Sequence, residues 1–144
     1  LVLIMKGKSV NTHLFIEATE QTPRVVFNLT EGQLAITGKS LPESGEQFYQ
    51  PILDWLDDAV NSTTEKVKMH IALDQMNISS SKMILFILYK LKKLKEAGKT
   101  VSVWWYHAEE DSDMREVGED YEFMVDIPFR FKSGKIEGSE LLVA

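Results

Sequence analysis

Residues 74–98 read DQMNISSSKMILFILYKLKKLKEAG, and this stretch decides the fold. It follows an alternating run from Val67 to Leu73 that predicts a strand. A polar turn comes next, and the apolar run from Met83 to Tyr89 predicts a helix from about residue 80 to residue 97, buried over its first half. A strand, a turn and a buried helix in this order indicate the centre of an α/β domain.

The turn contains three consecutive serines, where a helix needs side-chain oxygens to accept from its unpaired N–H groups. One of Ser79, Ser80 and Ser81 is therefore expected to be the N-cap. The positive end of the helix dipole lies at the same place and favours a phosphate group. The turn is thus both a capping site and the best candidate for a switch.

The hydrophobic pattern outside this stretch predicts further strands and two further helices. Strands are expected at 13–17, 24–29, 33–37, 67–73, 101–106 and 127–131. One helix is expected to follow the capping-box spacing of Ser40 and Glu43, with Pro51 kinking or restarting it. Another is expected over 112–125, with one face formed by Met114, Val117, Tyr121 and Met124.

The element order is therefore β-β-β-α-β-α-β-α-β, which predicts a single α/β domain with a mixed sheet. Trp105 is expected to share one face of its strand with Val101 and Val103, and Trp104 and Tyr106 lie on the other face. An exposed Trp104 or Tyr106 would mark an interface, because aromatic residues are enriched at binding hot spots.

Composition narrows the classes of function. The chain has 144 residues, a net charge of −6 and no cysteine, which disfavours general nucleic-acid binding and excludes disulfides and cysteine-ligated zinc. No apolar run approaches the roughly 20 residues of a membrane span. We expect a cytoplasmic protein with a flexible arm at 1–12, one domain at 13–132 and a tail at 133–144.

Several short blocks, in the same order over about residues 13–132, resemble the SiaC-like family of bacterial signalling proteins. The blocks are 17–23 (EATEQTP), 38–43 (GKSLPE), 48–49 with 51–56, 77–82 (NISSSK), and 105–106 with 109–116.

The resemblance implies a STAS-like fold, similar to the anti-anti-sigma factor SpoIIAA, with helices chiefly on one face of the sheet. It also implies a non-enzymatic partner switch in which a kinase phosphorylates the domain and a PP2C-type phosphatase reverses the reaction. The unphosphorylated form then binds a partner, by resemblance a diguanylate cyclase that governs biofilm formation. The residues implied at the interface are Asn77, Ile78, Ser79, Ser80, Ser81 and Lys82, with Glu109, Glu110 and Asp111 at its rim.

One position departs from the family pattern: Ile78 stands where the family has its phospho-acceptor threonine. Isoleucine has no hydroxyl group and cannot be phosphorylated. Either Ser79 or Ser80 takes over this role, or the protein is not phosphorylated and binds its partner constitutively.

Two other functions remain open. A small-molecule or lipid-binding module would need a pocket lined by residues such as Phe48, Trp55 and Phe86. A metal-dependent enzyme would have to use the acidic segment from Glu109 to Glu122, although this segment lacks the spacing of a calcium-binding loop and also suits a solvated helix face. No motif supports either, so we expect no cofactor, no metal and no catalytic residue.

Overall fold

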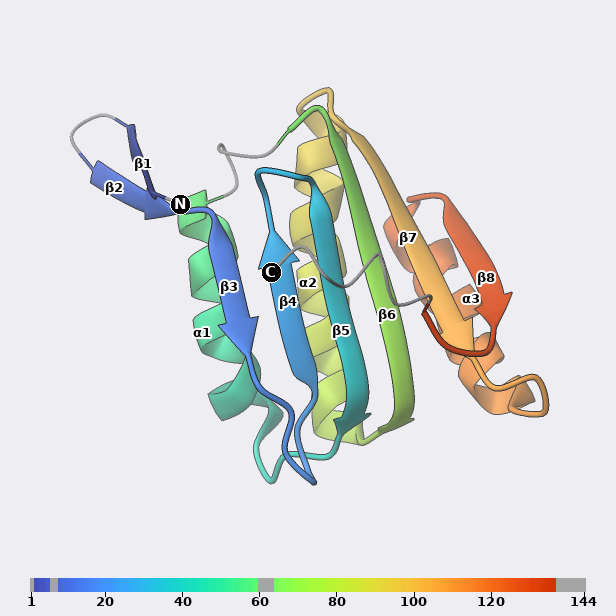
Figure 1. Cartoon of the computed structure of the whole chain (residues 1–144). Coiled ribbons are helices and arrows are strands. Elements are labelled where there is room, and N and C mark those ends of the chain that lie inside the picture. The colour runs from blue at the N-terminus through green and yellow to red at the C-terminus, as the bar shows by residue number, and fades with distance from the viewer. Residues whose placement is uncertain (1, 6–7, 60–63, 137–144) are drawn as a thin grey trace.

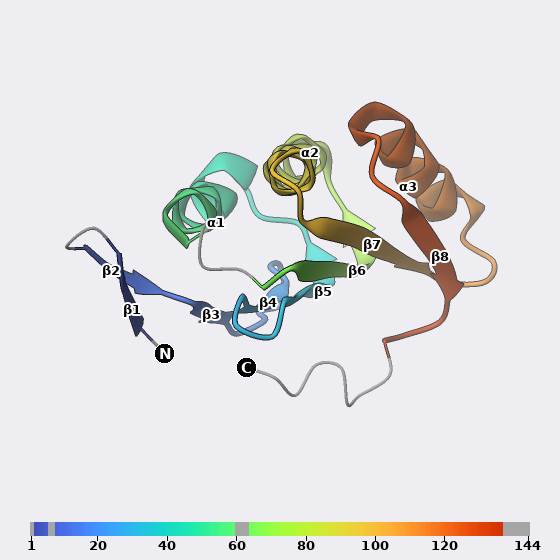
Figure 2. The ribbon, with the colours of Figure 1, turned by 90° about the horizontal axis from the view of Figure 1, so that it is seen from above.

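Six strands form one sheet, and three helices cover one of its faces (Figure 1, Figure 2). The computed structural model describes residues 2–5, 8–59 and 64–136, with the backbone alone at 2–5 and 8–10. The sheet strands are β3 (His13–Ile16), β4 (Arg24–Asn28), β5 (Gln33–Ser40), β6 (Lys66–Met76), β7 (Thr100–His107) and β8 (Phe129–Ser133). The helices are α1 (Gly45–Ala59), α2 (Ile78–Glu96) and α3 (Ser112–Val125).

The strands lie in the order β3-β4-β5-β6-β7-β8. The pairs β3–β4 and β4–β5 are antiparallel, and the pairs β5–β6, β6–β7 and β7–β8 are parallel. Because each parallel pair is joined through a helix, the carboxyl ends of β5, β6 and β7 meet at one edge of the sheet. From His13 onward the predicted element order, mixed sheet and placement of the helices are confirmed, whereas the two strands before His13 were not predicted.

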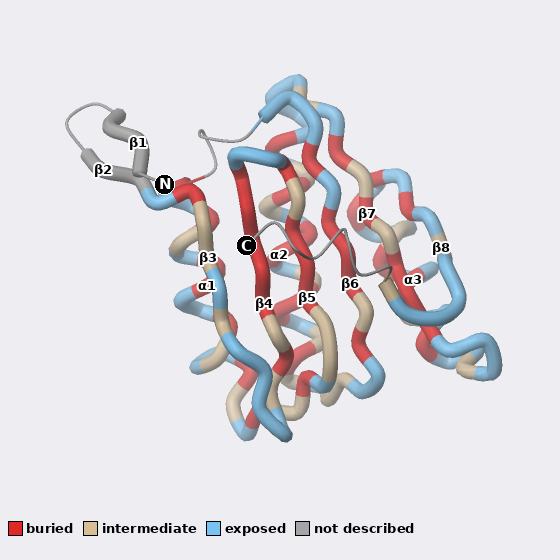
Figure 3. The backbone as a smooth tube through the Cα atoms, in the orientation of Figure 1, coloured by how far each residue is buried: buried red, intermediate tan, exposed pale blue. Residues whose placement is uncertain are grey.

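The core lies between the sheet and the helices. Buried residues run along the central strands (Figure 3), and Trp105 is fully buried with Val101 and Val103 in the same apolar cluster. Trp105 Nε1 donates to the carbonyl oxygen of Met114 at 2.9 Å, so the buried indole keeps a partner. The predicted placement of Trp105 and Trp104 on opposite faces of β7 is therefore confirmed, and Trp105 is the one on the helix side.

The first helix begins later than the capping box predicts. Ser40 is the last residue of β5, and α1 begins at Gly45. The side chain of Ser44 accepts from the amide of Gln47 at 3.2 Å, so Ser44 supplies the capping oxygen. The helix runs without interruption through Pro51, and the predicted restart there is wrong.

The buried faces of the other helices also differ from expectation. Phe86 and Tyr89 are exposed, so the first half of α2 is not buried on all sides: one stripe faces the solvent. In α3, Gly118 and Val125 face the sheet with Met114 and Tyr121, whereas Met124 is exposed. The small Gly118 fits here because its Cα approaches the Trp105 ring: a Cβ would lie 2.5 Å from the indole.

The ends of the chain lie partly outside the described residues. Residues expected as an arm contain two short strands, β1 (Val2–Met5) and β2 (Lys8–Asn11), which pair antiparallel. The flexibility of this arm and the boundaries of the domain at 13 and 132 stay predictions. Of the expected tail, residues 133–136 are described and the remainder lies outside. None of the helices in the described part of the chain has the length and apolar content of a membrane span.

Candidate partner-binding site at the start of α2

Asn77, not a serine, is the N-cap of α2, which corrects the prediction for the three serines. Its side-chain oxygen accepts from the amide of Ser80 at 3.0 Å, and its backbone is extended at this point. Asparagine is among the best N-cap residues because its short side chain reaches the free amides of the first turn. The amide group of Asn77 also donates to the carbonyl of Pro42 at 2.9 Å, which fixes the loop before α1 against α2.

Ser80 is buried and belongs to a hydrogen-bond network of hydroxyl groups. It is 0% exposed; its hydroxyl donates to the carbonyl of Ser40 at 3.1 Å and accepts from the Ser40 hydroxyl at 2.7 Å. The Ser40 hydroxyl in turn lies 2.6 Å from the hydroxyl of Tyr49, itself 0% exposed. With Tyr49 donating to Ser40, every hydroxyl donates once, so the buried polar groups are satisfied.

Burial shifts the acid–base behaviour of Tyr49. Removal from water raises its pKa from 10.0 to about 12, and the hydrogen bond with Ser40 partly offsets this shift. Burial also raises the pKa of Tyr121, whose hydroxyl donates to the carbonyl of Ser81 at 2.7 Å and ties α3 to the first turn of α2.

The raised pKa of Tyr49 predicts a loss of stability in alkali. The contribution of Tyr49 to the free energy of unfolding is fully present below pH 10. It is lost as the pH rises to about 12, because in that range only the unfolded chain releases the tyrosine proton. The loss is about 2–3 kcal/mol at about 1.4 kcal/mol per pKa unit. Tyr49→Phe is expected to flatten this decline, measured by urea unfolding at a series of pH values. An unchanged slope in Tyr49→Phe would contradict the assignment.

Ser79 is the serine that joins the starts of two helices while remaining partly exposed. Its hydroxyl accepts from the amide of Gly45 at 3.1 Å and donates to the side-chain oxygen of Asn77 at 3.2 Å. Gly45 is close to the backbone here: a Cβ at that position would lie 2.4 Å from the carbonyl oxygen of Ser79. The first residue of α1 thus rests directly on the first turn of α2.

Ile78 stands out into solvent at this surface. It is 90% exposed, whereas most large apolar side chains of the domain are in the core. Lys82, one turn further along α2, is also exposed, and its ammonium lies 3.8 Å from the carboxylate of Glu46. Such an exposed ion pair contributes little to stability. The accessible surface is therefore formed by Ile78, Ser79, Ser81 and Lys82, with Asn77 partly exposed and Ser80 beneath them.

The acidic residues Glu109, Glu110 and Asp111 follow β7 at the same edge of the sheet but do not join this hydrogen-bonded group. Glu109 and Glu110 are exposed, and Asp111 is the N-cap of α3, accepting from the amide of Met114 at 3.0 Å. Within the described part of the chain, no hydrogen bond or ion pair links Glu109 or Glu110 to residues 77–82. Their place at the rim stays a prediction.

Sequence reasoning missed Ser40, Gly45 and Tyr49 as parts of this site. Ser40 and Ser80 are 40 positions apart, and no local pattern signals such a contact. The family block at 38–43 was a hint, because its serine comes shortly after the strand predicted at 33–37.

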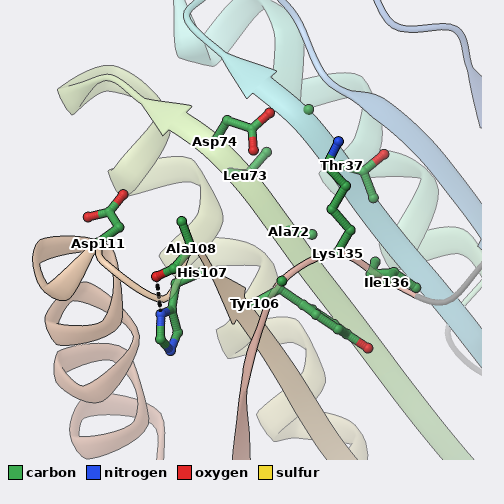
Figure 4. A pocket seen from close by; sticks show the side chains of 12 residues that line it. Thr37, Ala72, Leu73, Asp74, Tyr106, His107, Ala108, Asp111, Lys135 and Ile136 are labelled. Atoms are coloured by element: carbon green, nitrogen blue, oxygen red, sulfur yellow. Dashed lines mark hydrogen bonds between the residues drawn. The ribbon is translucent and has the colours of Figure 1, made fainter.

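Among the described residues, the sites that the two alternative functions were expected to use are not assembled. A cavity of about 410 Å³ lies on the other face of the sheet (Figure 4), and Phe48, Trp55 and Phe86 do not line it. Its lining includes Thr37, Asp74, Tyr106 and Lys135. Among the described residues, no three acidic or histidine side chains come together as metal ligands would.

Fold and site together define a small single-domain α/β protein with an accessible helix start built from short polar side chains around an exposed isoleucine. The chain belongs to the SiaC family of regulatory phosphoproteins, whose family model matches residues 16–134.

One relative and two solved structures are similar to this chain. An uncharacterised protein of Pseudomonas aeruginosa strain UCBPP-PA14 is 24% identical over 120 residues, which are 83% of this chain and 95% of that protein. The crystal structure of apo-SiaC from Pseudomonas aeruginosa superimposes with a TM-score of 0.77 at 24% identity, covering 85% of this chain and 99% of SiaC. SiaC in complex with the diguanylate cyclase SiaD, which it activates, gives the same TM-score and identity over 84% of this chain and 99% of SiaC.

Proposed function

We propose that this chain is a non-enzymatic regulatory protein that binds a diguanylate cyclase through the surface at 77–82. Membership of a family of regulatory phosphoproteins supports the regulatory role, and the complex of the structural neighbour SiaC with SiaD supports the class of partner. The 90% exposure of Ile78 at the helix start carries the proposal for the location. An apolar side chain in this position gains most when a partner covers it.

We propose further that phosphorylation at Ser79 controls this binding, with a kinase and a PP2C-type phosphatase as the opposing enzymes. Ser79 is partly exposed, whereas Ser80 is fully buried and bonded at both ends. A kinase needs an accessible hydroxyl, so the structure supports Ser79 over Ser80 as the acceptor. The cysteine-free sequence and the class of partner support a cytoplasmic location.

The physical effect of such a phosphate is local. It adds roughly −1.5 to −2 charges at the first turn of α2, where the helix dipole and the amide of Gly45 favour an anion. The folded domain therefore tolerates it. A partner that buries this surface has to remove the water around the phosphate, which costs several kcal/mol without a matching cation.

The test compares Ser79→Asp with the neutral and similarly shaped Ser79→Asn. Both variants are expected to keep the circular dichroism spectrum, and only Ser79→Asp is expected to lose affinity for the cyclase, by about tenfold. The partner is the diguanylate cyclase that co-purifies with the chain from its native cells, produced separately and titrated by calorimetry. Equal affinity of the two variants would show that a negative charge at Ser79 does not control binding.

A further inference from the structure

The face of the sheet opposite the helices carries a compact group of cations around Trp104. The ammonium groups of Lys68 and Lys132 lie 5.1 Å and 4.9 Å from the centre of the Trp104 ring, and the guanidinium carbon of Arg130 lies 5.5 Å from it. We call these four residues the Trp104 patch. Lys68 comes from β6, Trp104 from β7 and the other two from β8, with Arg130 directly opposite Trp104 in the register.

Ordinary structural roles explain only part of this arrangement. A cation over an aromatic ring stabilises the fold by about 0.5–1 kcal/mol, but a ring has two faces and here three cations approach it. Charged side chains on an edge strand discourage pairing with other chains, which suits Arg130 and Lys132 on β8. Lys68 lies on the internal strand β6, where this explanation does not apply.

In the part of the chain that the structure describes, the positive charges of the Trp104 patch are not paired with carboxylates, although the protein as a whole is acidic. None of Lys68, Arg130 and Lys132 forms an ion pair within the described residues, although the chain carries a net charge of −6. Trp104 Nε1 has no hydrogen-bond partner there either. Trp104 Nε1 is buried, so the groups open to a ligand are the three cationic side chains, which are donors only and pair with a negatively charged acceptor.

We propose that the Trp104 patch binds a short acidic segment of a second protein, through two or three carboxylates. The three cations surround a single ring, which matches a local cluster of carboxylates. A nucleic acid presents charge along its whole length, whereas the cations of the patch are confined to one ring on a chain with a net charge of −6. A membrane surface is recognised by clusters of about 4–8 basic residues, more than the patch supplies.

This inference goes beyond the proposed function because it concerns a different surface. All three helices lie on one face of the sheet (Figure 2), and the patch lies on the other. A cyclase bound at the start of α2 therefore leaves the patch open, and the chain can hold two partners together.

The experiment titrates the full chain with a short fluorescein-labelled Glu-Ser repeat peptide, followed by fluorescence anisotropy. The triple variant Lys68→Gln, Arg130→Gln and Lys132→Gln is expected to bind at least about tenfold more weakly than the wild type. The matched control is Lys92→Gln, Lys93→Gln and Lys95→Gln on α2, which removes the same charge elsewhere and is expected to bind as the wild type does. The peptide is also expected to shift the NMR resonance of the Trp104 indole N–H, assigned by its loss in Trp104→Phe.

Three results would overturn the proposal: equal binding by the wild type and the patch variant, an equal loss in the control, or an unmoved Trp104 resonance. Stronger binding to anionic lipid vesicles or duplex DNA than to the peptide, at ~0.15 M salt, would overturn the choice of partner. The patch variant is expected to bind the cyclase normally, so failure here leaves the proposed function standing.

Discussion

Replacing Ile78 with aspartate is expected to weaken binding of the cyclase by about thirtyfold and to leave the fold unchanged. The side chain is 90% exposed, so the substitution removes no core contact. Aspartate is also favoured in the first turn of a helix by the dipole. In the complex, however, an apolar contact at the centre of the interface is replaced by a charge, and central contacts contribute about 2 kcal/mol or more.

The control for this variant is Phe123→Asp. Phe123 is also 90% exposed but lies near the end of α3, whereas Ile78 is the first residue of α2. The same exchange of an exposed apolar side chain for a charge is expected to leave cyclase affinity within about twofold of the wild type. Calorimetry measures both variants. A similar loss in both, or none in Ile78→Asp, would mean that the interface is not centred on the helix start.

Replacing Ser80 with aspartate is expected to destabilise the whole domain by about 3–5 kcal/mol. Ser80 is 0% exposed, and its hydroxyl donates to the carbonyl oxygen of Ser40 and accepts from the hydroxyl of Ser40. A carboxylate there is a buried anion that faces the carbonyl of Ser40, with no cation among its hydrogen-bond partners. The loss is close to the total stability of many domains of this size, so partial unfolding at room temperature is expected.

The neighbouring position provides the control. Ser81→Asp is expected to change the free energy of unfolding by less than about 1 kcal/mol, because Ser81 is partly exposed and its hydroxyl bonds only its own turn, at the carbonyl of Ile78. Urea unfolding followed by circular dichroism compares the two variants. If Ser80→Asp proves as stable as Ser81→Asp, Ser80 is accessible after all and regains its place as a phosphorylation candidate.

The sequence predicted the sheet well because its signals are local. Alternation over Val67 to Leu73 and over Val101 to Trp105 indicated the central strands and placed Trp105 and Trp104 on opposite faces of β7, and the structure shows that Trp105 is the one in the core. The first residue of each helix was harder to predict, because several polar residues near each helix start can act as N-caps. Asn77 and Ser44 form the capping bonds because the loops place them there, and the composition of the loops alone did not distinguish them from Ser80 or Ser40.

The sequence predicted which segment forms the site, but not the separate role of each residue within it. Three serines in a row look equivalent in sequence, yet Ser80 faces the core, Ser79 bonds the amide of Gly45 and Ser81 bonds its own turn. The helical rotation of about 100° per residue separates their directions, and contacts with α1 and β5 then decide the role of each. The Trp104 patch could not be predicted from local sequence either, because its cations come from strands that are distant in sequence.

The location of the interface is tested most directly by hydrogen–deuterium exchange of the chain with and without the purified cyclase. We predict slower exchange in the complex at residues 77–82, with a smaller effect at 109–111, and no change along β8. Protection confined to other segments, with residues 77–82 exchanging as in the free chain, would contradict the claim that the start of α2 is the partner-binding surface.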